Sequence, residues 1–287
     1  GLPHFWGECE PCRVQATYCT AMKIPNLRPY LLLEVVAAMT LLGYGLFSNG
    51  EISSQAALPS KISQDGFTPI FDGKSLEGWE FDPVYWSVKE GAIVGEITAA
   101  TLLKNNTFII WKGGELGDFE LKVDYWISEK GNSGVQYRSD RYTELPYALR
   151  GYQADIDGAN RYTGQNYEER KRTTLAYRGQ RTQISAQPDG IAAVGGYVAN
   201  NAWKGLDLVN ELGDRAALGN LIKKGDWNTI HIVAKGNLMK HYVNGTLMSE
   251  VEDADTKNRK LSGLFGFQVH VGPPMKVMFK NILLKKG

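Results

Sequence analysis

The chain has 287 residues, of which 43% are hydrophobic and 22% charged, so it is long and apolar enough to bury a sizeable core. Its formal net charge of +1 argues against a nucleic-acid partner, because phosphate binding normally requires a marked basic excess or a basic stripe. The 32 glycines and 11 prolines, spread among many short apolar runs, are typical of a protein built from strands and turns.

The N-terminal region has the pattern of sequence that is removed from the mature protein. All the cysteines lie in residues 1–21, which we interpret as upstream sequence before a natural start at Met22. Residues 22–57 then combine a positive beginning, an apolar run and small residues, as a signal peptide and linker do. The apolar run is shorter than the about 20 residues of a membrane span. We therefore expect a protein that works outside the cytoplasm, with no stable membrane span after cleavage.

Strand patterns dominate the rest of the chain. Residues 119–128 alternate apolar and polar side chains, as a half-buried antiparallel strand does. Residues 227–251 hold three further strand patterns, and Asn244-Gly245 between the last two predicts a type I′ hairpin turn. The near-helical spacing of Leu206, Val209 and Leu212 predicts one short helix within residues 202–222. Residues 66–286 are thus predicted to form one all-β domain, a two-sheet antiparallel sandwich.

Three of the predicted strands bury one face and present amide, carboxylate, guanidinium or imidazole groups on the other. Such groups suit the recognition of a hydroxyl-rich ligand, whereas an ordinary wet face carries Lys, Glu and Thr. A shared site requires that the three strands be neighbours; in a purely structural sandwich they would not be. The polar residues are Gln136 and Arg138 in residues 134–138, Gln153, Asp155 and Asp157 in residues 151–158, and Gln268 and His270 in residues 265–271.

Ordinary two-carboxylate glycoside hydrolysis is not supported by these strands. Retaining sandwich glucanases carry the motif E-x-D-x-x-E, and Gln153-Ala154-Asp155 matches it only with the nucleophilic Glu replaced. A glutamine can neither form a glycosyl ester nor donate a proton at neutral pH.

Several segments resemble the 3-keto-disaccharide hydrolase domain family, formerly a bacterial domain of unknown function. The resemblance covers nearly all of the predicted mature chain, in order. It implies a secreted or periplasmic protein with a concanavalin A-like jelly roll. Many relatives carry Glu-x-Gln-x-x-Asp where this chain has Gln153 to Asp157, which indicates a variant subgroup. The matching segments are residues 66–79, 118–121, 132–138, 151–156, 167–169, 225–228 and 263–284.

The resemblance implies cleavage of a 3-keto-glycoside by elimination or hydrolysis. A ketone at C3 acidifies the C2 hydrogen, so the reaction needs a base, a positive group at the enolate oxygen and an acid. His270 or Asp155 is expected as the base, Arg138 as the electrostatic stabiliser and Glu169 as an acid or ligand. A divalent metal held by Asp155, Glu169 and His270 is an alternative stabiliser. The residues expected to position the carbohydrate are Asn132, Gln136, Gln153, Asp157, Tyr167 and Gln268. A lectin-like module without catalysis is the main alternative function.

Overall fold

The structure is a computed structural model that describes residues 65–287. The upstream segment predicted at residues 1–21 and the signal peptide and linker predicted at residues 22–57 lie outside the described residues. Within residues 65–287 no helix has the length and apolar character needed to cross a membrane.

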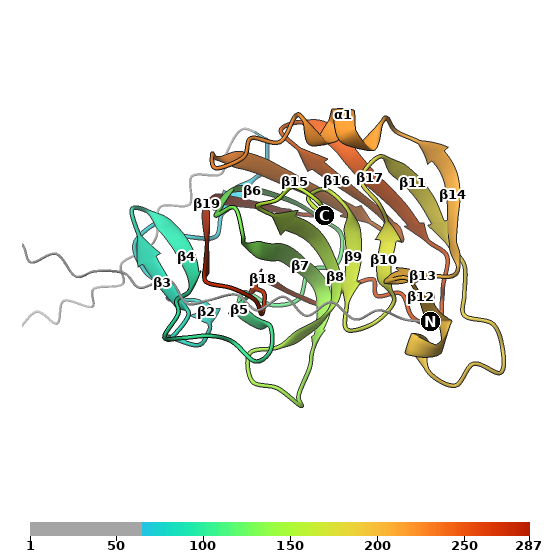
Figure 1. Ribbon diagram of the computed structural model, residues 1–287, viewed down its shortest axis with the longest axis horizontal. Helices are drawn as coiled ribbons and strands as arrows, with labels where there is room; N and C mark the ends of the chain where they lie inside the picture. Colours follow the sequence, from blue (N-terminus) through green and yellow to red (C-terminus); the bar gives the residue numbers. More distant parts are fainter. Residues whose placement is uncertain (1–64) are drawn as a thin grey trace, which may run out of the picture. The chain divides into compact units, whose positions relative to one another are not determined.

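Two sheets stack face to face, so the predicted β-sandwich of jelly-roll type is confirmed (Figure 1). In the described part of the chain one sheet has ten strands, ordered β14-β11-β17-β16-β15-β6-β19-β4-β3 with β1 beside β19. Its strands are β1 (Thr68–Pro69), β3 (Trp86–Lys89), β4 (Ala92–Ile97), β6 (Phe119–Ile127), β11 (Gln180–Ile184), β14 (Leu206–Glu211), β15 (Asn228–Lys235), β16 (Leu238–Val243), β17 (Thr246–Asp253) and β19 (Met275–Lys286).

The second sheet has nine strands over the same residues, ordered β12-β13-β10-β9-β8-β7-β18-β5-β2. Most neighbours in both sheets are antiparallel, while β10 with β13 and β11 with β17 are parallel. Its strands are β2 (Trp79–Glu80), β5 (Thr107–Trp111), β7 (Asn132–Arg141), β8 (Leu149–Asp157), β9 (Asn166–Glu169), β10 (Thr173–Ala176), β12 (Val198–Ala199), β13 (Ala202–Trp203) and β18 (Leu264–Val269).

The local strand predictions are confirmed. Buried and half-buried residues alternate along the whole of β6, as the sequence pattern required. Strands β16 and β17 form the predicted hairpin, and the φ angles of Asn244 (50°) and Gly245 (80°) are both positive, as a type I′ turn demands.

A short helix is present within residues 202–222 as predicted, but the residues whose spacing suggested it lie outside that helix. Leu206 and Val209 lie on β14, which pairs with β11 from Leu206 to Glu211. The helix α1 (Arg215–Gly219) begins after Asp214, whose carboxylate caps it by accepting the backbone N–H of Ala217 at 2.8 Å. Pairing with β11 therefore overrode a weak helical periodicity over the first half of the segment. A 3₁₀ turn, η1 (Val194–Tyr197), is the other helical element in the described region.

The three polar strands are neighbours: β8 pairs with β7, and β7 pairs with β18. A purely structural sandwich was expected to keep these three strands apart, so their pairing contradicts that alternative. Tyr137, Tyr152 and Phe267 from these strands are fully buried in the core between the sheets, so the polar residues between them lie on the outer face of the nine-stranded sheet.

Arg138 departs from the predicted alternation. The register of β7 against both neighbours shifts just beyond Tyr137, and Arg138 has a φ of 43°. This bulge turns the side chain toward the ten-stranded sheet, because a bulge breaks the two-residue period. There the buried guanidinium donates to the carbonyl oxygens of Gly117 and Gly236 and to Oδ1 of Asp118. The expectation that Arg138 shares a face with Gln136 is therefore wrong.

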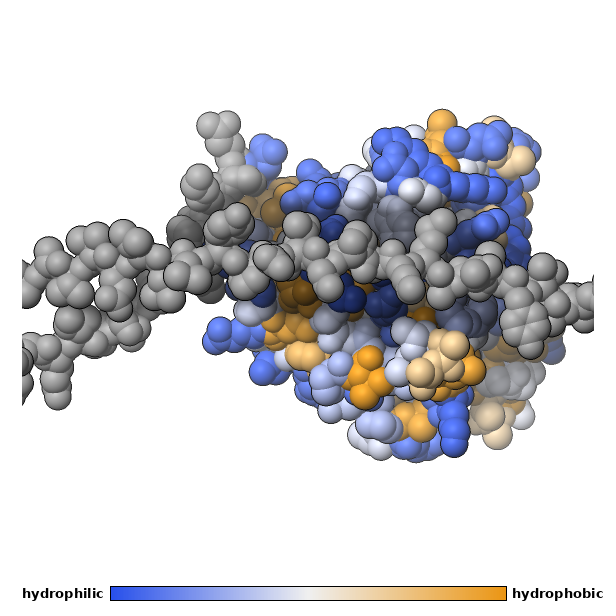
Figure 2. All heavy atoms as spheres, turned by 60° about the vertical axis from the view of Figure 1, so that its left-hand side comes forward, coloured by the Kyte–Doolittle hydropathy of each residue, from blue (hydrophilic) through white to orange (hydrophobic). Residues whose placement is uncertain are grey.

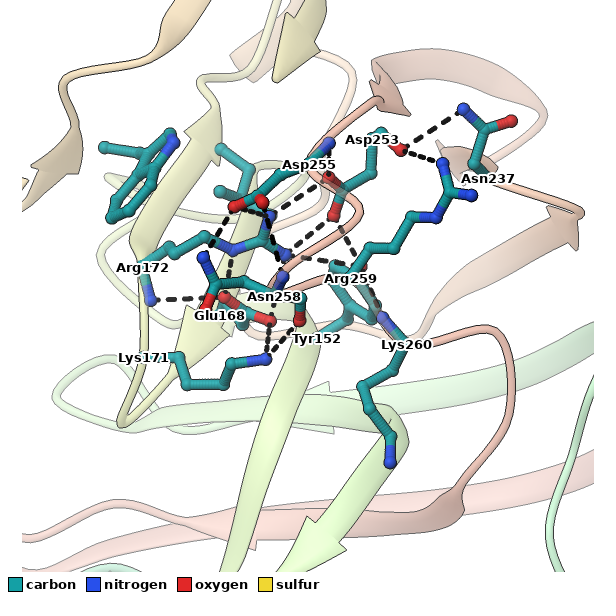
Figure 3. Close-up of polar contacts among 12 residues, drawn as sticks. Tyr152, Glu168, Lys171, Arg172, Asn237, Asp253, Asp255, Asn258, Arg259 and Lys260 are labelled. Carbon is teal, nitrogen blue, oxygen red and sulfur yellow. Dashed lines mark hydrogen bonds and ion pairs between the residues drawn. The ribbon is translucent and has the colours of Figure 1, made fainter. Parts of the chain in front are cut away.

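A buried ionic cluster ties the two sheets together around Arg172 (Figure 3). Its guanidinium contacts Glu168 at 2.5 Å, Asp253 at 2.7 Å and Asp255 at 3.3 Å. Burial alone would raise the pKa of Glu168, yet the charge and hydrogen bonds of Arg172 hold that pKa below its usual value. Since Glu168 lies on β9 and Asp253 on β17, the cluster fixes one sheet against the other.

Candidate active site

The outer face of the nine-stranded sheet is enclosed rather than flat. Asn106 directly precedes β5, and Glu169 ends β9, with three strands between β5 and β9. In a flat sheet these two strands would lie about 19 Å apart. The amide of Asn106 nevertheless donates to Oε1 of Glu169 at 3.0 Å. The connection before β5 must therefore reach over the outer face of the sheet to the end of β9.

Asp155 lies at the floor of this site, on β8, with 6% of its surface exposed. Gln153 donates its amide to Oδ1 at 2.7 Å, and Gln165 donates its amide to Oδ2 at 2.5 Å. Burial raises the pKa of Asp155 to about 7; the two amide hydrogen bonds oppose the shift, and the charges of Glu169 and Asp157 add to it. The group can thus exchange a proton near neutral pH, as a general base must.

Gly134 makes room for this arrangement. It pairs with Asp155 across β7 and β8, and a Cβ atom on it would lie 2.3 Å from Cδ of Gln153. The side chain of Gln153 therefore crosses directly over the glycine, which lets its amide reach the neighbouring carboxylate. A larger residue at position 134 would displace Gln153.

Glutamine amides with spare hydrogen-bonding capacity surround the carboxyl group. The Nε2 group of Gln136 donates to the carbonyl oxygen of Gly151 at 3.1 Å. Gln268 follows Phe267, which pairs with Val135, so its side chain lies on the outer face near Gly134. Buried polar groups normally find partners, so spare ones in an enclosed site mark places for a polar ligand. Among residues 65–287 no partner is present for Oε1 of Gln136, Gln153 and Gln165, or for either amide atom of Gln268.

Glu169 and Tyr167 belong to the same face, because Gly151 pairs with Glu169 and Gln153 with Tyr167. Burial raises the pKa of the Tyr167 phenol, and the charges of Glu169 and Asp155 raise it further. Arg170 places Nε 3.7 Å from Oε1 of Glu169. The site thus holds two carboxyl groups, Asp155 on β8 and Glu169 at the end of β9, with the cation of Arg170 beside Glu169.

The remaining predicted residues lie toward the end of the sheet. Asp157 accepts the backbone N–H groups of Arg161, Tyr162 and Thr163, so its carboxylate is committed to a turn. Asn132 and His270 contact each other through a backbone hydrogen bond, in which the His270 N–H donates to the Asn132 carbonyl at 3.3 Å.

The metal-ligand set is not assembled. His270 follows the end of β18 and is partly exposed, with Nδ1 at 2.6 Å from the carbonyl of Val271. Both oxygens of Asp155 are held by amides, and Oε1 of Glu169 is held by Asn106. No group of three or more potential metal ligands occurs in residues 65–287, so the candidates Asp155, Glu169 and His270 are not brought together as a ligand set in this structure.

Two contributors were missed from the sequence. Gln165 directly precedes β9, and the β8–β9 hairpin places it opposite Asp155, whose backbone N–H donates to the Gln165 carbonyl at 3.3 Å. The alternation through Tyr167 and Glu169 could therefore have been extended to Gln165. Asn106 lies in the connection from β4 to β5 and reaches Glu169 across the sheet, so no local pattern could have identified it.

Fold and site together define a concanavalin A-like jelly roll with an enclosed polar face around a titratable carboxyl group. The chain belongs to the 3-keto-alpha-glucoside-1,2-lyase-like domain family, whose model matches residues 66–285. It is 28% identical over 98 residues to a 3-keto-disaccharide hydrolase from Bacteroides thetaiotaomicron. That alignment covers 30% of this chain and 32% of the relative, so the chain matches about a third of that protein's length.

Solved structures with similar folds include a candidate glycosyl hydrolase from Parabacteroides distasonis, at 19% identity and a TM-score of 0.49, covering 80% of this chain and 98% of that one. A carbohydrate-binding module from Bacillus subtilis has 15% identity and a TM-score of 0.44, with 73% and 96% covered.

Proposed function

We propose that the protein cleaves glycosides whose sugar carries a ketone at C3, with Asp155 as the base that removes the C2 proton. The observation that carries this proposal is the enclosed carboxyl group of Asp155, held by two glutamine amides with a pKa of about 7. The reaction needs a base near C2. Burial raises the pKa of Asp155 to about 7, the range in which a carboxyl group can act as a general base near neutral pH.

The reaction balances without a carboxylate nucleophile. Asp155 takes the C2 proton, and the electron pair moves onto the C3 oxygen as an enolate. The ketone then re-forms, a C1–C2 double bond appears, and the C1–O bond breaks. The leaving oxygen takes a proton, and addition of water across the double bond completes hydrolysis.

Other residues of the site are assigned by position. The spare amide N–H of Gln268 lies on the face that would meet the enolate oxygen, a role in which a fixed donor stabilises developing charge. Glu169 lies at the wall formed with Asn106 and is assigned to protonate the leaving oxygen. Gln268 takes the stabilising role that the sequence suggested for Arg138, because the Arg138 guanidinium is turned to the other sheet.

The test is turnover of a 3-keto-disaccharide in D₂O, followed by NMR of the released keto sugar. Proton removal at C2 predicts one deuterium at that carbon. Asp155→Asn should reduce kcat by at least about 10²-fold, in the range of general-base loss. Asp207→Asn, an exposed carboxylate on β14, is the matched control and should leave kcat unchanged. Cleavage without deuterium, or full activity of Asp155→Asn, would contradict the proposal. Binding without turnover would support the lectin-like alternative.

A further inference from the structure

His241 is a fully buried histidine to which the proposed mechanism gives no role. It lies on β16 of the ten-stranded sheet, and its ring packs edge-on against the ring of Tyr137 in the core. Polar and apolar residues are mixed over the surface that Figure 2 brings forward, where polar groups can turn to water. A buried imidazole has no such access to solvent, so its two ring nitrogens must find partners inside the protein.

Both ring nitrogens of His241 have partners on the opposite side of the core. Nδ1 lies 3.3 Å from the carbonyl oxygen of Gln165, and Nε2 lies 2.8 Å from the hydroxyl of Tyr137. Burial lowers the pKa of His241 to about 4, although the Gln165 carbonyl opposes the shift, so the ring is neutral and carries one N–H at neutral pH. A carbonyl oxygen can only accept, which places that proton on Nδ1 and leaves Nε2 to accept from Tyr137.

The hydrogen bonds around His241 form one directed chain. The amide of Asn166 donates to the Tyr137 hydroxyl at 3.2 Å, and that hydroxyl donates in turn to Nε2 of His241. His241 then donates from Nδ1 to the carbonyl of Gln165. Gln165 and Asn166 are consecutive residues at the beginning of β9, one held through its carbonyl and the other through its side chain. The chain is therefore fixed at this point from inside the core.

The side chain of Gln165 carries the contact that matters to the site. Its amide donates to Oδ2 of Asp155 at 2.5 Å, while its carbonyl accepts both the backbone N–H of Asp155 and Nδ1–H of His241. Among residues 65–287 no partner is present for Oε1 of Gln165. A glutamine side chain has many rotamers, so the position of this amide depends on that one bond and on the backbone that carries it.

We infer that His241 is a positioning residue for the site: by donating from Nδ1 to the Gln165 carbonyl, it keeps the Gln165 amide on Oδ2 of Asp155. The inference rests on the proposed function for its effect on catalysis, because Asp155 is the base there. It adds that the alignment of this base is set from the ten-stranded sheet, through the core. A histidine that only filled the core would stabilise the fold without acting through Gln165.

Two substitutions separate positioning from packing. His241→Asn places an amide N–H near the position of Nδ1 and loses the bond to Tyr137, whereas His241→Gln reaches the Tyr137 hydroxyl and loses the bond to Gln165. Each variant keeps one buried hydrogen bond and gives up another, so a role confined to packing predicts equal effects. Positioning predicts that only His241→Gln impairs the site.

Kinetics with a 3-keto-disaccharide at pH 7 measure the effect on catalysis. His241→Gln should lower kcat by about tenfold or more and change KM by less than about twofold, because a misplaced base acts on the transition state and not on substrate binding. His241→Asn should keep kcat within about twofold of wild type. Equal losses of kcat in the two variants would overturn the inference.

A double variant shows whether His241 acts through Gln165. Both His241→Gln and Gln165→Leu remove the same contact to Asp155, so combining them should lower kcat no further than Gln165→Leu does alone. Additive losses of kcat would mean that His241 acts by another route and would overturn the inference.

An NMR measurement of the full chain does not depend on turnover. The side-chain amide signal of Gln165, assigned by its loss in Gln165→Leu, should exchange slowly with solvent in the wild type, because a short buried hydrogen bond holds it. His241→Gln should shift this signal and speed its exchange, while His241→Asn should leave it in place. His231→Gln, at a partly exposed histidine on β15, is the control and should also leave it in place.

The NMR result separates this inference from the proposed function. If no 3-keto-glycoside is turned over but only His241→Gln moves the Gln165 signal, His241 still positions the amide and only the proposed function fails. A signal that moves equally in both His241 variants, or in neither, would overturn the inference.

Discussion

The amide of Gln165 donates to Oδ2 of Asp155 at 2.5 Å, and the backbone N–H of Asp155 donates to the Gln165 carbonyl at 3.3 Å across the β8–β9 hairpin. The amide hydrogen bond stabilises the charged carboxylate and opposes the effect of burial on the pKa of Asp155. Gln165 is thus a positioning residue that adjusts the proposed base.

Gln165→Leu should move the pH profile of kcat/KM. The base must be ionised, so activity should rise through an apparent pKa of about 7 in the wild type. Losing one charge-assisted hydrogen bond should raise that value by about one unit. Gln183→Leu, an exposed glutamine on β11, should leave the profile in place. A profile that stays fixed in Gln165→Leu would show that this amide does not act on the base.

Asp155 should also make the protein less stable as pH rises. Its pKa is about 7 in the folded chain against 3.8 in the reference state, so between those values the folded chain keeps a proton that the unfolded chain has lost. Stability from this group is complete below the lower value and is lost as pH rises through the upper one. Asp155→Asn removes the effect, so its unfolding free energy relative to wild type should increase by roughly 2–3 kcal/mol from about pH 5 to about pH 8.

Urea unfolding at both pH values measures this difference, and Asp207→Asn provides the comparison for an exposed carboxylate. A constant difference between wild type and Asp155→Asn would mean that the carboxyl group titrates normally.

Gly134→Ala should impair catalysis with a smaller effect on the fold. The new Cβ would meet Gln153 at 2.3 Å, so the amide must leave Oδ1 of Asp155. We expect kcat/KM to fall by about tenfold or more, since one charge-assisted hydrogen bond to the base is lost. Gly195→Ala, where a Cβ meets nothing within 4 Å, is the control and should keep full activity. Wild-type kinetics in Gly134→Ala would remove Gln153 from the proposed machinery.

The sequence predicted much of this fold because its signals were local. The alternation along β6 and the Asn244-Gly245 turn each depend on a few consecutive residues, and both are found as expected. The same local rule failed at Arg138, because a bulge set by two neighbouring strands reverses which face the side chain takes. The helical conformation suggested by the spacing of Leu206 and Val209 was wrong for a similar reason, since pairing with β11 decides their conformation.

The candidate site was predictable only in part. Gln136, Gln153, Asp155 and Gln268 follow from strand alternation together with neighbouring strands, and the structure brings them to one face. Asp155 is held by Gln153 from its own strand and by Gln165 from the β8–β9 connection, whereas Glu169 is held by Asn106 from the connection before β5. Both carboxylates and one of their partners, Gln153, were therefore named from the sequence, but Gln165 and Asn106 were not.

The ionic cluster around Arg172 should dominate stability at the junction of the two sheets. Arg172→Ala leaves Glu168, Asp253 and Asp255 without their shared cation, and all three carboxylates are buried. Removing one partner of a buried network typically costs about 3–5 kcal/mol, because desolvated charges lose their compensation. We expect a loss of that size in the unfolding free energy at neutral pH, measured by urea denaturation.

The loss of unfolding free energy in Arg172→Ala should be smaller at acidic pH, and the direction of this change follows from the pKa of Glu168. Arg172 lowers the pKa of that carboxyl below the reference value of 4.5, so its stabilisation is present above that value and disappears as pH falls through the lower folded value. Lys89→Ala is the matched control, because its pair with Glu96 joins side chains that are 56% and 32% exposed. Such a surface pair contributes at most about 1 kcal/mol. If Arg172→Ala were no more destabilising than Lys89→Ala, the cluster would not hold the sheets together.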